Sequence, residues 1–195
     1  DTLALWVAFF FGLMVNYVVV LLLPALLSGP GIGFSQPAAS RALAMSNYGG
    51  VIGAVLGALV IQRVGSRLAM LGMSAGAVGG GLLLARTPLD PGNPTRLLIG
   101  LLLTGGLVNG VQTTMYALAA HVYPTRMRGM GVGTAVAMGR IGNAVAAYAG
   151  SAAIDRGGAA GYFTLWSWLM VVVFAALAAM SRHVRPASRP APDAQ

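Results

Sequence analysis

Four polar side chains recur at helical spacing inside an otherwise apolar segment of the chain. They are Asn109, Gln112, Thr113 and Tyr116. Spacings of i, i+3, i+4 and i+7 place all four on one face of a helix. Such a face either lines a polar cavity or makes hydrogen bonds to a neighbouring helix. We favour cavity lining, because four polar groups share the face, and we predict that they contact a polar solute.

A single arginine, Arg140, interrupts the next apolar run, which extends from Gly129 to Ile154. A lone charge at the middle of a bilayer costs about 2.5 kcal/mol or more, so it usually faces a cavity or a partner. On a helix Arg140 shares a face with small residues and with Asn143. A planar guanidinium can bind a carboxylate through two hydrogen bonds. We predict that Arg140 and Asn143 contact an anionic solute; the alternative is a structural arginine.

Three further polar residues are weaker candidates for solute contact. Asn16 and Tyr17 lie near the middle of the first apolar run, and Asn47 lies in the second. Each is as consistent with packing as with binding, and residues adjacent in sequence point to different faces of a helix. A histidine can shuttle protons, but the position of His121 at the end of an apolar run favours a helix cap.

The composition is that of a membrane protein. Hydrophobic residues make up 57% of the chain and charged residues 8%, whereas a soluble domain has about 25% charged residues. The 28 glycines suit helices that pack closely in lipid. Without cysteine the chain has no disulfide or thiolate metal site, and we expect no cofactor and no metal. All four aspartates lie outside the apolar runs, so no carboxylate at membrane depth is available to carry a proton.

Six apolar segments are long enough to cross a bilayer, since a spanning helix needs about 20 mostly apolar residues. The predicted spans are residues 3–27, 41–62, 68–85, 97–121, 129–154 and 162–180. They form two triplets of opposite orientation, as in inverted repeats. The predicted fold is therefore an all-α membrane protein of six transmembrane helices in two three-helix repeats, over residues 1–182. Residues 183–195 form a basic tail that we expect to be disordered and cytoplasmic. Trp166 and Trp168 are predicted interfacial anchors.

The arginines are distributed unevenly between the two sides of this predicted bundle. Six spans place both termini on one side, together with seven arginines: Arg63, Arg67, Arg126, Arg128, Arg182, Arg185 and Arg189. The opposite side carries four, and the positive-inside rule therefore places both termini in the cytoplasm. All 12 basic residues are arginines, and apart from Arg140 they occur singly or in pairs near the ends of apolar segments, or in the tail. This pattern indicates membrane topology and argues against a nucleic-acid partner.

Two sequence blocks carry a family resemblance. They are LLLPALLSGPGIGFSQPAASRALAMSNYGGVIGAVLGALVIQRVGSR and YPTRMRGMGVGTAVAMGRIGN. The second contains Tyr-Pro-x-x-x-Arg-Gly-x-Gly-x-Gly followed by Gly-Arg-x-Gly. The chain resembles the C-terminal six-helix half of a major facilitator superfamily transporter, most like the aromatic acid:proton symporter group. The family's cytoplasmic turn Asp-Arg-x-Gly-x-Arg has Gln62 at its acidic position here, which weakens any gating contact of a carboxylate with Arg63 or Arg67 around Gly65.

The resemblance implies an alternating-access carrier whose central cavity lies between two six-helix halves. Its implied partners are the lipid bilayer, an N-terminal half that carries the acidic residues of proton coupling, protons, and a small organic anion such as an aromatic acid. The implied location is the bacterial cytoplasmic membrane. Because this chain begins with Asp1 and is hydrophobic within a few residues, we expect it to be a fragment.

Three other classes of protein are weighed against this expectation. An intramembrane serine enzyme needs a serine and a histidine that meet at membrane depth. His121 lies at the very end of a predicted span and His183 lies beyond the last one, so neither is at membrane depth, and we predict that the chain is not an enzyme. A self-contained six-span channel or permease subunit that oligomerises, or a non-transporting remnant of a carrier, stays open as an alternative.

Overall fold

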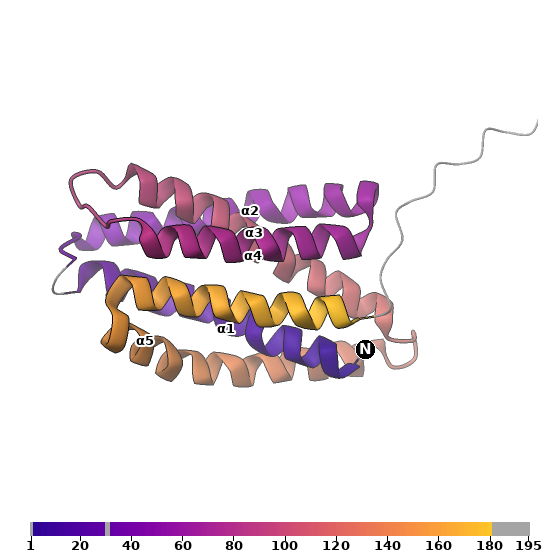
Figure 1. The fold of residues 1–195 in the computed structure, drawn as a ribbon. Helices are drawn as coiled ribbons and strands as arrows, with labels where there is room; N and C mark the ends of the chain where they lie inside the picture. The colour runs from indigo at the N-terminus through magenta and orange to yellow at the C-terminus, as the bar shows by residue number, and fades with distance from the viewer. Residues whose placement is uncertain (1, 30–31, 181–195) are drawn as a thin grey trace, which may run out of the picture.

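All the regular secondary structure in the described part of the chain is helical. The computed structural model describes residues 2–29 and 32–180 (Figure 1). Its helices are α1 (Thr2–Ser28), α2 (Gln36–Val64), α3 (Ser66–Arg86), α4 (Thr95–Val122) and α5 (Arg128–Ala179). Each of these five helices is long and apolar enough to cross a membrane. The predicted all-α membrane fold is therefore confirmed, while the predicted tail, residues 183–195, lies outside the described residues.

The last helix, α5, contains two crossings of the bundle. Its 52 residues would extend about 78 Å if straight, well over twice the thickness of the hydrocarbon core of a bilayer. Gly158 has φ 55° and ψ −138°, a conformation that glycine adopts easily, and the chain turns back there. Figure 1 shows the two limbs, residues 128–157 and 159–179, which correspond to the fifth and sixth predicted spans. Five helices thus give six crossings among the described residues.

The second helix begins earlier than its apolar run. α2 starts at Gln36, whereas the predicted span starts at residue 41. The side chain of Ser35 caps the helix by accepting a hydrogen bond of 3.4 Å from the backbone N–H of Ala38, and Pro37 lies in the first turn, where its missing N–H costs nothing. At the other end Gly65 has φ 85° and joins α2 directly to α3 in a tight turn.

The two predicted triplets are α1, α2 and α3, and α4 with the two limbs of α5. The contacts between helices are the same when each helix is replaced by its counterpart in the other triplet. α2 packs along α4, and α1 packs along α5. A Cβ added at Gly49 or Gly53 of α2 would overlap the carbonyl oxygens of Leu102 and Gly106 in α4, and one added at Gly142 of α5 would overlap the carbonyl oxygen of Phe10 in α1. Both pairs of helices therefore meet backbone to backbone through glycine. The counterparts are α1 and α4, α2 and the first limb of α5, and α3 and the second limb of α5. The two helices of each such pair run in opposite directions (Figure 1), as inverted repeats require.

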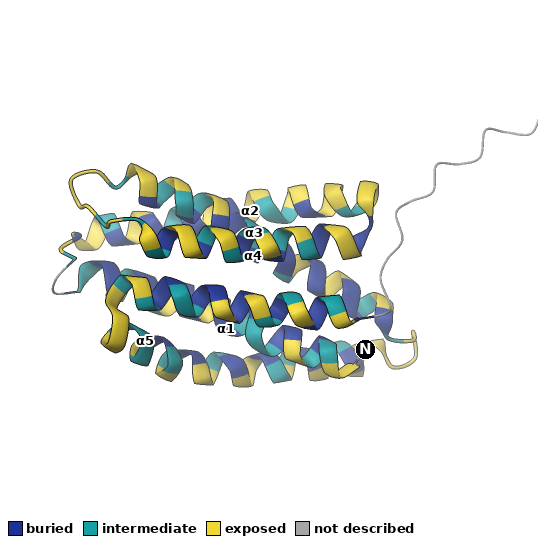
Figure 2. Cartoon of the chain, viewed as in Figure 1, coloured by how far each residue is buried: buried dark blue, intermediate teal, exposed yellow. Residues whose placement is uncertain are grey.

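The second limb of α5 supplies three of the four largest fully buried side chains among the described residues. Tyr162, Phe163 and Trp166 are fully buried, and the rings of Phe163 and Trp166 stack with centroids 6.0 Å apart. The Tyr162 hydroxyl donates a hydrogen bond of 3.3 Å to the carbonyl of Val18. The prediction that Trp166 is an interfacial anchor is wrong, because it shares the inward face with Tyr162 and Phe163. Trp168 is 65% exposed. Figure 2 shows the buried residues on the faces between helices.

Candidate functional site

Three amide side chains join α1 to α4 at the middle of both helices. Nδ2 of Asn16 donates to Oδ1 of Asn109 at 3.2 Å and to Oε1 of Gln112 at 2.9 Å. Nδ2 of Asn109 donates in turn to the carbonyl of Gly105 at 2.9 Å, one turn earlier on α4. All three amides are half-buried. We call Asn16, Asn109 and Gln112 the amide cluster; it lies near mid-depth in the bundle.

A small cavity adjoins the amide cluster. Its volume is about 10 Å³, roughly the size that one water molecule requires, and Asn16, Asn109 and Asn47 help to line it. Ser46 and Trp166 close its other sides; the Trp166 Nε1 is buried and has no hydrogen-bond partner among the described residues. The candidate residues Asn16, Asn47 and Asn109 are therefore neighbours in space although they come from three helices.

The rest of the polar stripe on α4 lies at the surface of the bundle. Tyr116 is 38% exposed, and its ring meets the edge of the buried Phe9 ring at a centroid distance of 5.1 Å and an angle of 89°. Thr113 is also exposed. The predicted stripe is therefore divided: Asn109 and Gln112 make the interhelical hydrogen bonds that we considered as the alternative, while Thr113 and Tyr116 remain accessible.

Arg140 is exposed on the first limb of α5, at the depth of the Tyr116 ring. Its neighbours Gly139 and Gly142 lie against the backbone of Phe9 and Phe10 in α1. Because the Phe9 ring contacts Tyr116, Arg140 and Tyr116 are at similar heights along α1. The structure does not join Arg140 or the exposed Tyr17 to the amide cluster by a hydrogen bond. Asn143 is half-buried, and its Oδ1 has no partner within the described part of the chain.

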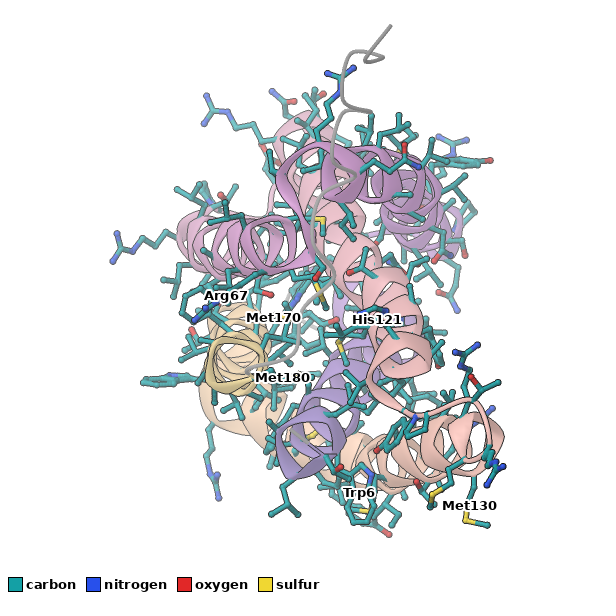
Figure 3. The ribbon with its side chains drawn as sticks, turned by 90° about the vertical axis from the view of Figure 1, so that its right-hand side faces the viewer. Trp6, Arg67, His121, Met130, Met170 and Met180 are labelled. Atoms are coloured by element: carbon teal, nitrogen blue, oxygen red, sulfur yellow. The ribbon has the colours of Figure 1, made fainter. Side chains whose placement is uncertain are left out.

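The predicted gating and topology residues gather at one end of the bundle. Arg63, Arg67, Arg126 and Arg128 are exposed there, beside the turn at Gly65 and the connection between α4 and α5. Figure 3 views the bundle from this end, with Arg67 and His121 labelled. No ion pair is found for these arginines among residues 2–29 and 32–180. A gating role for them stays a prediction.

The connection between α4 and α5 explains one glycine of the second sequence block. Tyr123 is half-buried, and a Cβ added at Gly131 would overlap its ring. The tyrosine that begins the block therefore packs on the glycine eight positions later, which fixes the direction in which α5 begins.

Sequence reasoning missed several residues around the amide cluster. Gly50 of α2 lies so close to Asn109 that an added Cβ would be 2.9 Å from its Cγ, and Ser46 is buried one turn earlier. Phe9 supports the Tyr116 ring, and Trp166 closes the small cavity. The Ser46, Asn47 and Gly50 run was a detectable signal, because it places small and polar residues together in an apolar helix.

The fold and site together define a polytopic α-helical membrane protein with hydrogen-bonding groups at mid-depth. Residues 5–195 match the family model of the Major Facilitator Superfamily, and the chain belongs to this family. It is therefore a member of a transporter family and not an enzyme.

Named relatives are similar over most of the chain. It is 33% identical to the 4-hydroxybenzoate transporter PcaK of Pseudomonas putida over 162 residues. This aligned segment covers 80% of this chain and 34% of the relative. It is 32% identical over 193 residues to a gallate transporter of the same organism, 97% of this chain and 41% of the relative. The 3-(3-hydroxy-phenyl)propionate transporter of Escherichia coli K12 is 38% identical over 146 residues, 72% of this chain and 34% of the relative. The aligned part is thus 34–41% of the length of these relatives.

Proposed function

We propose that this chain is the C-terminal six-helix half of a proton-coupled secondary transporter for small organic anions, in particular aromatic acids. The family match and the names of the relatives support a transporter of this class. The observation that carries the proposal is the amide cluster, which places hydrogen-bonding side chains at mid-depth in an apolar bundle. A carrier with alternating access needs such groups at the centre of the membrane, where two repeats meet.

In this proposal the exposed polar residues of α4 and the first limb of α5 line a central cavity. Arg140 binds the carboxylate of the solute through its planar guanidinium. Tyr116 and Thr113 contact the remainder of the solute, and Asn47 and Tyr17 border the cavity. Proton coupling then depends on acidic residues in the other half, since Asp90 and Asp155 lie at a helix connection and near the α5 bend.

The exposure of Arg140 favours a half carrier over a self-sufficient six-span subunit or a remnant. A guanidinium near the middle of a crossing cannot face lipid at low cost. A second six-helix half placed over this face would cover it and complete the cavity. The same proposal places the protein in a bacterial cytoplasmic membrane, with the arginine-rich end of the bundle in the cytoplasm.

Uptake into membrane vesicles tests the proposal. Labelled 4-hydroxybenzoate would be supplied under an imposed inward proton gradient to vesicles that hold either this chain alone or this chain joined to its N-terminal half. Uptake in the joined protein only, abolished when the gradient is dissipated, is the expected result. Uptake by the chain alone would show that six spans suffice and would overturn the half-carrier proposal. No uptake of any aromatic acid by the joined protein would overturn the proposed substrate class.

A further inference from the structure

The hydrogen-bond directions in the amide cluster are fixed by one backbone carbonyl. The Gly105 carbonyl can only accept, so the Asn109 atom that faces it must be Nδ2. Its Oδ1 therefore accepts from Asn16, whose facing atom must be Nδ2. Because the same Nδ2 also donates to Gln112, the facing atom of Gln112 must be Oε1. Oxygen and nitrogen of all three amides are thus assigned without reference to hydrogen positions.

Two polar atoms remain free once these directions are assigned. Gln112 Nε2 can donate and Asn16 Oδ1 can accept, and neither has a partner within residues 2–29 and 32–180. Neither belongs to the buried atoms without a partner, so both retain accessible surface. They belong to amides that are hydrogen bonded to each other at 2.9 Å. The cluster therefore presents one donor and one acceptor on adjacent groups.

We propose that Gln112 and Asn16 form a two-point site for a ring hydroxyl of the transported aromatic acid. Gln112 Nε2 donates to the hydroxyl oxygen, and the hydroxyl donates to Asn16 Oδ1. A carboxylate cannot use both atoms, because it is only an acceptor when ionised and Asn16 Oδ1 would repel it. A hydroxyl satisfies both. This inference rests on the proposed function. It places the hydroxyl end of the solute at Gln112 and Asn16, opposite the carboxylate end at Arg140.

The spacing of the two ends suits a substituted benzene ring. Arg140 lies at the level of Phe9 and Phe10 on α1, and Asn16 lies six to seven residues further along the same helix. At 1.5 Å per residue this separates the two groups by about 10 Å along the axis. A benzene ring with a carboxylate and a distant hydroxyl spans this order of length with one hydrogen bond at each end. Tyr116 lies at the Arg140 end. Two of the relatives are named for hydroxylated aromatic acids, 4-hydroxybenzoate and 3-(3-hydroxy-phenyl)propionate.

A series of three ligands tests the site without any substitution. Uptake of 4-hydroxybenzoate, 4-methoxybenzoate and benzoate would be measured in the joined protein. A methoxy oxygen accepts from Gln112 but cannot donate to Asn16, and benzoate does neither. We expect the KM for 4-hydroxybenzoate to be about tenfold lower than the KM for benzoate, and the KM for 4-methoxybenzoate to be higher than that for 4-hydroxybenzoate. The loss of one or two neutral hydrogen bonds predicts these differences.

The variant Gln112→Met removes the Nε2 donor, together with the Oε1 that accepts from Asn16, and keeps the length of the side chain. We expect it to raise the KM for 4-hydroxybenzoate about tenfold and to leave the KM for benzoate within about twofold of its value in the unaltered protein. The matched control is Gln36→Met, at the exposed first residue of α2, which should change neither value. Two outcomes would overturn the hydroxyl site and leave the proposed function standing. One is equal KM values for the three ligands in the unaltered protein; the other is an equal rise in KM for benzoate and 4-hydroxybenzoate in Gln112→Met. No uptake of any of the three would overturn both.

Discussion

Arg140 is the only charged side chain within the first limb of α5 between Gly129 and Ile154. We expect Arg140→Ala to be inserted and folded normally, because the side chain is exposed and makes no hydrogen bond in the described part of the chain. Uptake of 4-hydroxybenzoate should fall at least about tenfold, since a charge-assisted bidentate pair is lost. Arg140→Lys keeps the charge without the planar fork and should retain intermediate uptake.

Two measurements separate this expectation from a structural role of Arg140. Arg96→Ala, at the exposed start of α4, is the matched control and should leave uptake unchanged. Expression and monodispersity in detergent should be the same for all three variants. Normal uptake by Arg140→Ala would remove Arg140 from the mechanism, whereas loss of the folded protein would assign it to structure.

At the scale of single residues, the sequence shows which side chains share a helix but not what faces them. Helical spacing predicted the common face of Asn109 and Gln112, and the structure agrees. It could not predict that Asn16 meets them, because that contact joins residues more than ninety positions apart and depends on how α1 packs on α4. Equally, Asn16 and Tyr17 were equivalent candidates until the structure placed one in the cluster and the other at the surface.

At the scale of helices, glycine sets the distance between α2 and α4. Gly53 faces the carbonyl of Gly106 with no room for a Cβ, whereas nothing lies within 4 Å of a Cβ added at Gly79 of α3. We expect Gly53→Ala to separate the two helices and to lower stability by about 1–3 kcal/mol, as overpacking does. Gly79→Ala should leave stability unchanged or raise it slightly, because alanine is the better helix former.

Thermal unfolding in detergent, followed by intrinsic tryptophan fluorescence, distinguishes these two variants. A change of 1–3 kcal/mol corresponds to a shift in Tm of roughly 2–12 °C for a protein of this size. The expected result is a lower Tm for Gly53→Ala and an unchanged Tm for Gly79→Ala. If both variants lowered Tm equally, the effect would come from helix propensity or insertion, and the close contact of α2 with α4 would not limit stability.

Helix boundaries and buried faces show where local patterns give incomplete information. The predicted α4 span, residues 97–121, agrees closely with Thr95–Val122, since proline and arginine mark its start. α2 extends five residues before its predicted start because the Ser35 cap and Pro37 continue the helix beyond the apolar run. Trp166 shows the other difficulty: aromatic residues near a span end suit an interface, but the partner helices decide which ring is buried.

At the scale of the whole molecule, the relation between the two three-helix triplets makes the contact of α2 with α4 the counterpart of the contact of α5 with α1, although these helices are far apart in sequence. Gly49 and Gly53 of α2 pack on the backbone of α4, and Gly139 and Gly142 of α5 pack on the backbone of α1. The two candidate groups, the amide cluster and Arg140, each lie beside one of these glycine contacts, because Gly50 touches Asn109 and Gly139 precedes Arg140. Each group is therefore placed by a close contact between a helix of one triplet and a helix of the other, which the sequence similarity of the triplets is too weak to reveal.

The two ends of the bundle should lie on opposite sides of the membrane, with Arg63, Arg67, Arg126 and Arg128 inside. The chain has no cysteine, so a single introduced thiol reports its own side without further changes. Thr125→Cys at the arginine-rich end and Asn93→Cys at the other end are both at exposed positions. A membrane-impermeant maleimide should label Asn93→Cys in intact cells and Thr125→Cys only after permeabilisation. The reverse pattern would show that the arginines do not set the topology, and labelling of both in intact cells would contradict a bundle that spans the bilayer.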